Sequence, residues 1–266
     1  MNISTISPRE AAALVRRDAD NRAHIVGLSG GKDSTAMALR LVQANPDVPY
    51  TFFCTPTGDE LPPLLDHWNL LAEVLAPAPF LFVQTEKNGL PLTLAGLIDE
   101  FEALPNWRQR WCTRLLKIVP GEAFMRFVLL GGPVRSYIGL RADEETRAGL
   151  YAPDLDQCHP LREWGWGINE VRGYLAELGV CIPRRTDCAS CFFQTIPEWK
   201  VLLEEHPEAY AIAADAEQRI GHTFRSNGRD TWPAGLKELA EEFRAGRKVR
   251  GEMQYREGQK CRACAL

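Results

Sequence analysis

The sequence predicts an α/β fold built on a mainly parallel sheet. Through the first 180 residues, short apolar runs alternate with segments of helical periodicity, which is the pattern of successive β-α-β units. A glycine-rich hexapeptide lies between the first apolar run and the helical segment after it. From residue 181 onward, cysteine pairs and helical segments replace this alternation. We therefore expect an α/β domain over 1–180 and a smaller, cysteine-bearing, mostly helical region over 181–266.

Local patterns predict the individual elements. Apolar runs of strand length predict buried strands at 24–28, 50–54, 80–83 and 134–140. Apolar residues at helical spacing predict helices in the first domain over 8–19, 35–43 and 61–75. Pro62 and Pro63 fall in the first turn of the third helix, where a proline is tolerated. In the C-terminal region the same spacing predicts helices over 198–205, 207–221 and 234–246.

Composition and charge exclude several protein classes. With 45% hydrophobic and 25% charged residues, the chain is a globular protein and not a collagen-like, disordered or coiled-coil one. No apolar run approaches the ~18 residues needed to span a bilayer, so we expect no membrane partner. Charged residues interrupt any secretory apolar segment near the N-terminus: Arg9, Glu10, Arg16 and Arg17. We expect a cytoplasmic protein, in which eight cysteines indicate metal or redox chemistry and not disulfides.

The hexapeptide Ser-Gly-Gly-Lys-Asp-Ser at 29–34 has the features of a phosphate-binding loop. Gly30 and Gly31 allow the backbone to approach a phosphate closely with its N–H groups turned inward. The helix that follows adds the positive end of its dipole. Lys32 supplies a mobile cation, and Asp33 can hold Mg²⁺ or cap the helix. The hydroxyl donors of the loop are Ser29 and Ser34. A capped turn without a ligand is the less favoured interpretation.

This hexapeptide resembles the PP-loop of the adenine-nucleotide alpha-hydrolase superfamily. That superfamily includes ATP pyrophosphatases, tRNA and DNA sulfur-transfer enzymes and PAPS reductases. The resemblance implies a Rossmann-like, parallel five-stranded sheet with helices on both faces. It also implies that ATP with Mg²⁺, or a related adenylate, binds at the carboxyl ends of the strands. Chemistry would occur at the α-phosphate, usually with release of AMP and pyrophosphate.

Further segments resemble the PAPS reductase-like branch of this superfamily. Residues 55–62 resemble its D-T-G-x-x-x-P turn, although Pro56 stands where an acid is usual. The resemblance makes Thr57, Gly58 and Asp59 nucleotide-binding candidates at the end of a strand, where ligands bind in open α/β sheets. A plain turn capped by Asp59 is the alternative.

Residues 139–147 resemble the G-x-R-x-x-[ED]-x-x-R element of the same branch, and 159–164 its P-L-x-x-W segment. The resemblance adds Gly139 to the nucleotide-binding candidates. Arg141 and Arg147 can grip phosphate or sulfate oxygens in fork geometry. Glu144 can orient Arg147 or bind Mg²⁺. An exposed charged loop is the alternative.

Four cysteines occur as two Cys-x-x-Cys pairs: Cys188, Cys191, Cys261 and Cys264. Four thiolates in two pairs suit a tetrahedral zinc ion or an iron–sulfur cluster. The family resemblance favours a [4Fe–4S] cluster, with Zn²⁺ as the alternative, and a redox or sulfur-carrying dithiol stays open. Either of two further cysteines can replace one of these ligands: Cys112 or Cys181.

Cys112 lies in a segment, 103–121, that has no acidic residue. Its cationic neighbours are Arg108, Arg110 and Arg114. Because nearby cations lower a thiol pKa, we expect Cys112 to be a sulfur-handling thiolate or a cluster ligand in the active site, with a packing role as the alternative. Residues 111–117 resemble a cysteine-bearing helix of the branch, in which cluster-containing APS reductases have two adjacent cysteines and this chain has Trp111 before Cys112.

Three functions remain open from the sequence. The leading hypothesis is an ATP-dependent PP-loop enzyme, similar to the DNA-phosphorothioation sulfur-transfer branch, that adenylates an acceptor and supports sulfur transfer. The second is an APS or PAPS reductase that forms sulfite, although the chain lacks the E-C-G-L-H tail of PAPS reductases. The third is a non-catalytic nucleotide- or nucleic-acid-binding adaptor. The expected protein partners are a cysteine desulfurase as sulfur donor or a thioredoxin-like reductant. The catalytic candidates are Lys32, Asp33, Cys112, Arg141 and Arg147.

Overall fold

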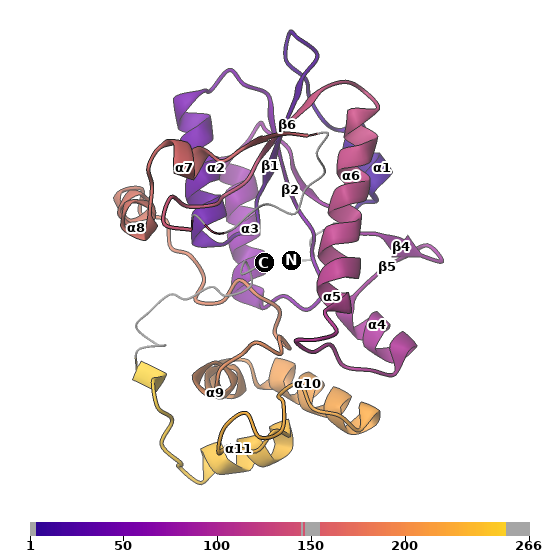
Figure 1. Cartoon of the computed structure of the whole chain (residues 1–266), viewed down its shortest axis with the longest axis vertical. Coiled ribbons are helices and arrows are strands. Elements are labelled where there is room, and N and C mark those ends of the chain that lie inside the picture. The colour runs from indigo at the N-terminus through magenta and orange to yellow at the C-terminus, as the bar shows by residue number, and fades with distance from the viewer. Residues whose placement is uncertain (1–3, 145, 147–154, 254–266) are drawn as a thin grey trace.

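The computed structural model describes residues 4–144, 146 and 155–253 of the 266-residue chain (Figure 1). Its centre is one sheet of five strands, which are β1 (Ala23–Gly27), β2 (Tyr50–Cys54), β3 (Phe80–Phe82), β6 (Val134–Tyr137) and β7 (Asp156–Cys158). Their order is β3-β2-β1-β6-β7, and every neighbouring pair is parallel. This confirms the predicted α/β class and the five-stranded parallel sheet. A short antiparallel hairpin of β4 (Glu86–Lys87) and β5 (Leu90–Pro91) stands apart from it.

The helices of the first part of the chain are α1 (Pro8–Ala13), α2 (Lys32–Ala44), α3 (Pro62–Val74), α4 (Leu94–Phe101), α5 (Trp111–Thr113), the π-helical segment η1 (Arg114–Ile118), α6 (Val119–Leu129), α7 (Pro160–Glu163) and α8 (Ile168–Glu177). The helices of the C-terminal region are α9 (Ile196–Glu205), α10 (Pro207–Ile220) and α11 (Leu236–Arg244). None of the helices in the described part of the chain is both long and apolar enough to cross a membrane.

Several predicted boundaries were wrong. The first helix ends at Ala13 and not at residue 19, and Arg17 instead forms an isolated antiparallel bridge with Ala23. The second helix begins at Lys32, three residues before its predicted start. The fourth strand ends at Tyr137, and the strand after it, β7, was not among the four predicted runs.

Alternate residues of the central strands face opposite helical layers, as the two-residue period of a strand requires. Val26 and Phe52 pack with α2 and α8 on one face of the sheet, while Ile25 and Phe53 pack with α1 and α6 on the other. Figure 1 shows these helices on opposite sides of the strands. All four side chains are 9% exposed or less, so β1 and β2 form the buried centre of the domain. Both faces are covered, which is what an all-parallel sheet needs.

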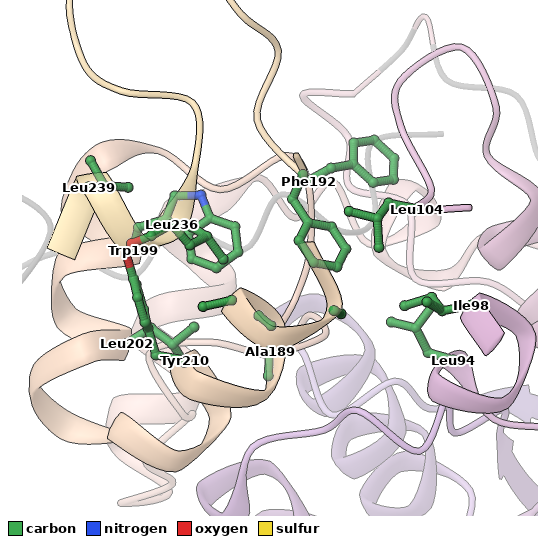
Figure 2. Close-up of a cluster of buried hydrophobic side chains, with 14 of the residues drawn as sticks. Leu94, Ile98, Leu104, Ala189, Phe192, Trp199, Leu202, Tyr210, Leu236 and Leu239 are labelled. Atoms are coloured by element: carbon green, nitrogen blue, oxygen red, sulfur yellow. Dashed lines mark hydrogen bonds between the residues drawn. The ribbon is translucent and has the colours of Figure 1, made fainter. Parts of the chain in front are cut away.

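The C-terminal helices share one hydrophobic cluster with α4, although α4 belongs to the first 180 residues of the chain. Figure 2 shows Trp199, Leu202 and Leu236 of α9 and α11 on one side of the cluster, and Leu94 and Ile98 of α4 on the other. The helical region therefore packs directly against the α/β part, below the sheet in Figure 1.

Glu217 is a buried carboxylate at the centre of this helical region. Its two oxygens accept from the Phe224 amide at 2.8 Å and from the Leu236 amide at 2.6 Å. Burial raises the pKa of Glu217 to about 7, and the two amide bonds offset only part of that effect. The carboxylate thus ties the end of α10 to the start of α11 while its charge is poorly solvated.

The Glu217→Gln substitution tests this electrostatic cost. A carboxyl whose pKa is raised in the folded state stabilises the fold below its unfolded pKa, and this contribution is lost as pH rises through about 7. The melting temperature of the native protein minus that of Glu217→Gln should therefore fall between pH 4.5 and pH 8. Glu208→Gln, at an exposed position of the same helix, should show a flat difference. A flat difference for Glu217→Gln as well would contradict the assignment.

Candidate active site

The hexapeptide 29–34 forms the connection from β1 to α2. Gly31 is the residue before the first helical turn and Gly30 has a positive φ of 81°, a conformation that L side chains rarely adopt. Ser34 donates to the Gly31 carbonyl at 3.1 Å, and its hydroxyl lies 3.0 Å from that of Ser29. The loop thus has the conformation expected of a phosphate cradle at the N-terminus of a helix.

Asp33 connects this loop to the segment after β6. Its Oδ2 accepts from Lys32 Nζ at 3.1 Å and from the Arg141 guanidinium at 2.9 Å. These three side chains are 17%, 10% and 14% exposed, so the charges are largely removed from water. The second oxygen, Oδ1, is buried and has no hydrogen-bond partner among the described residues. A buried carboxylate oxygen without a partner is a ready ligand for a hard cation.

Sheet order explains why Arg141 reaches Asp33. β1 pairs with β2 on one side and with β6 on the other. The chain adds β2 and β3 on the first side and then β6 and β7 on the second, so the strand order switches sides between β1 and β6. Ligands of open α/β sheets bind at this switch point, outside the carboxyl ends of the strands. Gly139 follows β6 so close to α2 that an added Cβ would lie 3.3 Å from Ser34 Cα. The structure therefore places Gly139 and Arg141 beside the phosphate loop.

The segment after β6 is held by its own contacts. Arg141 Nε donates to Asp143 at 2.8 Å, and its guanidinium lies 3.7 Å from Glu144. Arg162, in the P-L-x-x-W segment, donates to the Glu144 carbonyl at 2.5 Å and weakly, at 3.4 Å, to that of Arg141. The P-L-x-x-W segment thus supports the arginine-bearing turn. Arg147 lies outside the described residues.

The turn after β2 is organised by Glu60, which sequence reasoning missed. Its carboxylate accepts from the Thr57 amide at 2.8 Å, the Thr57 hydroxyl at 2.6 Å and the Gly58 amide at 3.0 Å. The Thr-x-x-Glu spacing of a capping box is the signal that could have identified it. Asp59, the nucleotide-binding candidate that was alternatively a cap of this turn, has its carboxylate directed to the loop before α9.

Asp59 binds the cysteine loop, residues 188–191, which precedes α9. Its carboxylate accepts from the Ser190 amide at 2.8 Å and its carbonyl from the Ala189 amide at 2.7 Å. Burial raises the pKa of Asp59 to about 6. In addition, the Thr57 hydroxyl lies 3.2 Å from Cys188 Sγ. The turn after β2 therefore fastens the cysteine loop to the carboxyl edge of the sheet.

Three cysteines line one pocket between η1 and the cysteine loop. Cys112, Cys188 and Cys191 share its wall with Arg110 and Lys117, and the pocket encloses about 520 Å³, its open mouth included. Cys181 is exposed, while Cys261 and Cys264 lie outside the described residues. Within the described ranges, no group of three or more His, Cys, Asp or Glu side chains is already arranged around a metal position.

Burial keeps the pocket thiols protonated at neutral pH. It raises the pKa of Cys191 to about 12, that of Cys188 even higher, and that of Cys112 above its ordinary value. Arg110 and Lys117 do lower the pKa of Cys112, but by less than burial raises it. The expectation that cations make Cys112 a thiolate was therefore wrong. Cys54 is buried at the end of β2, in the hydrophobic core.

Comparison with known proteins adds little. No protein-family model matches the chain, and no curated protein does. One similar solved structure is phosphoadenylyl-sulfate (PAPS) reductase from Candida auris in a phosphate complex. The two chains are 16% identical, with 66% of this chain and 82% of that chain covered, and the TM-score is 0.42. At this level the similarity carries no argument about function.

The raised thiol pKa values predict slow alkylation of the pocket cysteines. In metal-free protein at pH 7.5, Cys188 and Cys191 should react with iodoacetamide at least about tenfold more slowly than the exposed Cys181, because each pKa unit above the pH removes tenfold of the reactive thiolate. Peptide mass spectrometry over time measures each rate, with Cys181 as the internal reference. Equal rates at all three cysteines would show that the pocket thiols are neither buried nor shifted.

Proposed function

We propose that the chain is a PP-loop enzyme of the PAPS reductase-like branch that binds ATP and cleaves it between the α- and β-phosphates. One observation carries the proposal. Asp33 lies at the start of α2 between Lys32 and Arg141, at the switch point of the sheet, with one buried oxygen unpaired among the described residues. Phosphate-binding loops of α/β sheets occupy this place, and the sequence Ser-Gly-Gly-Lys-Asp-Ser is the PP-loop pattern.

The residues present fit a magnesium ion. Mg²⁺ is usually held by one or two carboxylates together with substrate phosphates, and Asp33 Oδ1 is available for this. When bound, the ion would offset the charge of the phosphates. Arg141 and Lys32 already share Asp33 Oδ2, so the carboxylate would stay in place when its other oxygen bound the metal.

In the proposed reaction, each residue of the site has a separate task. The loop amides and Lys32 bind the phosphates, and Arg141, together with Arg147, stabilises the charge that develops at the α-phosphate. An acceptor oxygen attacks the α-phosphorus, the bond to the pyrophosphate oxygen breaks, and the acceptor proton leaves to solvent. The products are an adenylated acceptor and pyrophosphate. A sulfur nucleophile then displaces AMP from the acceptor.

The thiol pocket is the proposed sulfur-handling part of the site. Cys188 and Cys191, with Cys112 in the same wall, are soft ligands of the kind that bind a [4Fe–4S] cluster or, alternatively, Zn²⁺. The remaining ligands in this proposal are Cys261 and Cys264. Bound there, a cluster would activate or hold the transferred sulfur. A cysteine desulfurase is the proposed donor of that sulfur.

A second candidate is a reductase of APS or PAPS, with a thioredoxin-like reductant as partner. This reaction is favoured by a contact between the proposed nucleotide site and the thiol pocket. The hydroxyl of Thr57, in the turn after β2, lies 3.2 Å from Cys188 Sγ. A sulfonucleotide would present its sulfur atom, and not a phosphate to be cleaved, to the thiol pocket.

The Lys32→Ala substitution tests the ATP-cleaving reaction. It removes the only cationic side chain of the hexapeptide, so release of AMP and pyrophosphate from Mg-ATP should fall at least about 100-fold. Lys237→Ala, at an exposed position of α11, is the matched control and should retain full turnover. Turnover that survives Lys32→Ala intact would remove the loop from the mechanism.

Metal analysis tests the thiol pocket independently of ATP. Anaerobically purified protein should contain about four iron and four acid-labile sulfide per chain, or about one zinc under the alternative. Cys188→Ser should lower that content strongly, whereas Cys181→Ser, at an exposed cysteine, should not. Protein free of both metals, purified and reconstituted under argon, would leave only the dithiol interpretation.

A further inference from the structure

Two side chains of α3 lie directly beneath the phosphate loop. Trp68 is 3% exposed, and its indole Nε1 donates to the Ser29 carbonyl at 3.0 Å. His67 is 4% exposed, and its Nε2 lies 3.4 Å from the Thr35 hydroxyl in the first turns of α2. His67 also has a hydrogen bond with the Gly30 main chain, which raises the pKa of the ring by less than burial lowers it.

The orientation of the Ser29 carbonyl determines where the next amide points. In a trans peptide the C=O and the following N–H are directed oppositely. The Ser29 carbonyl faces the indole of Trp68, so the N–H of Gly30 is directed away from α3. The N–H of Gly31 donates to Ser29 Oγ at 3.3 Å within the loop. A backbone N–H directed away from the packed side of a loop is a donor for a bound anion.

Packing leaves the loop little freedom to turn over. A Cβ added to Gly30 would lie 2.5 Å from Trp68 Nε1 and 2.9 Å from Leu64 Cδ1, so the glycine rests directly on the indole. The indole in turn packs against Phe82 of β3, with ring centroids 5.6 Å apart. Burial lowers the pKa of His67 to about 4, so the ring stays neutral and can donate through one nitrogen while it accepts through the other.

We infer that Trp68 and His67 are positioning residues, which hold the backbone of the phosphate loop in the conformation that binds the phosphates of the nucleotide. The inference rests on the proposed function and adds to it residues that do not touch the ligand. It predicts that removing either donor loosens the loop in the free protein and weakens nucleotide binding, even where the fold is retained.

The chain offers a matched control for the tryptophan. Trp199 is fully buried in the C-terminal cluster, and its Nε1 has no hydrogen-bond partner in the part of the chain that the structure describes. Trp68→Phe and Trp199→Phe therefore remove the same atoms from a buried site, but only Trp68→Phe removes a donor to the loop. For the histidine, His67→Leu removes both polar atoms, whereas His67→Gln keeps a donor and an acceptor.

Hydrogen exchange and calorimetry on the full chain test the inference together. In the free protein, peptides covering 28–35 should exchange faster in Trp68→Phe and His67→Leu, but not in Trp199→Phe. Mg-ATP affinity should fall about tenfold in the first two variants, the loss expected for one buried hydrogen bond, and His67→Gln should recover part of it.

The outcomes separate this inference from the proposed function. Unchanged exchange in Trp68→Phe, or equal weakening of Mg-ATP binding by Trp199→Phe, would overturn the positioning role. Native protein that does not bind Mg-ATP would overturn the proposed function, and the exchange of the 28–35 peptides would then decide the positioning role by itself.

Discussion

The candidate site depends on the two ion pairs of the Asp33 carboxylate. The carboxylate lies between Lys32 of the phosphate loop and Arg141 of the segment after β6, and all three charges are largely withdrawn from water. Without this carboxylate, two buried cations would face each other, which is far more costly than the ion pair itself. Because β1 and β6 are parallel neighbours, the loops that follow them lie at the same edge of the sheet. This brings Arg141 close to Asp33.

A second consequence of the same sheet is that the hexapeptide loop and the pocket cysteines lie at one edge. The turn after β2 fastens the cysteine loop through Asp59 and places the Thr57 hydroxyl against Cys188. The cysteine loop leads into α9, whose Trp199 belongs to the cluster shared with α4. The helical region is thus a wall of the site and not a separate appendage, and its stability bears on the geometry of the pocket.

Much of this architecture was predictable, since the buried centre of a parallel sheet leaves strong apolar runs in the sequence. β1 and β2 are of this kind. β7 is not, because an edge strand of Asp-Gln-Cys carries no such run. The sequence pattern placed the hexapeptide 29–34 between the first strand and the second helix, as the structure has it. The partners that hold this loop come from α3, 30 or more positions away, where the helical period indicates only packing.

The predictions about Cys112 and Asp59 differ from the structure for one physical reason. Sequence neighbours suggested that Arg108, Arg110 and Arg114 would lower the pKa of Cys112, whereas burial by residues distant in the chain raises it. Desolvation depends on the folded environment, and spacing along the chain contains no measure of it. The direction of Asp59 toward the cysteine loop is likewise set by a tertiary contact, whereas the capping of the turn by Glu60 is a local contact that its Thr-x-x-Glu spacing signals.

Thermal denaturation with competing ligands is the direct test of whether the hexapeptide loop binds ATP. Anaerobically purified protein would be melted with Mg-ATP, APS or PAPS, each titrated to saturation. A ligand at about 100 times its Kd stabilises the folded state by about 2.7 kcal/mol, a shift that is readily measured. We expect Mg-ATP to raise the melting temperature, and APS and PAPS to raise it less. Stabilisation by APS or PAPS with none by Mg-ATP would contradict this expectation and identify a sulfonucleotide reductase.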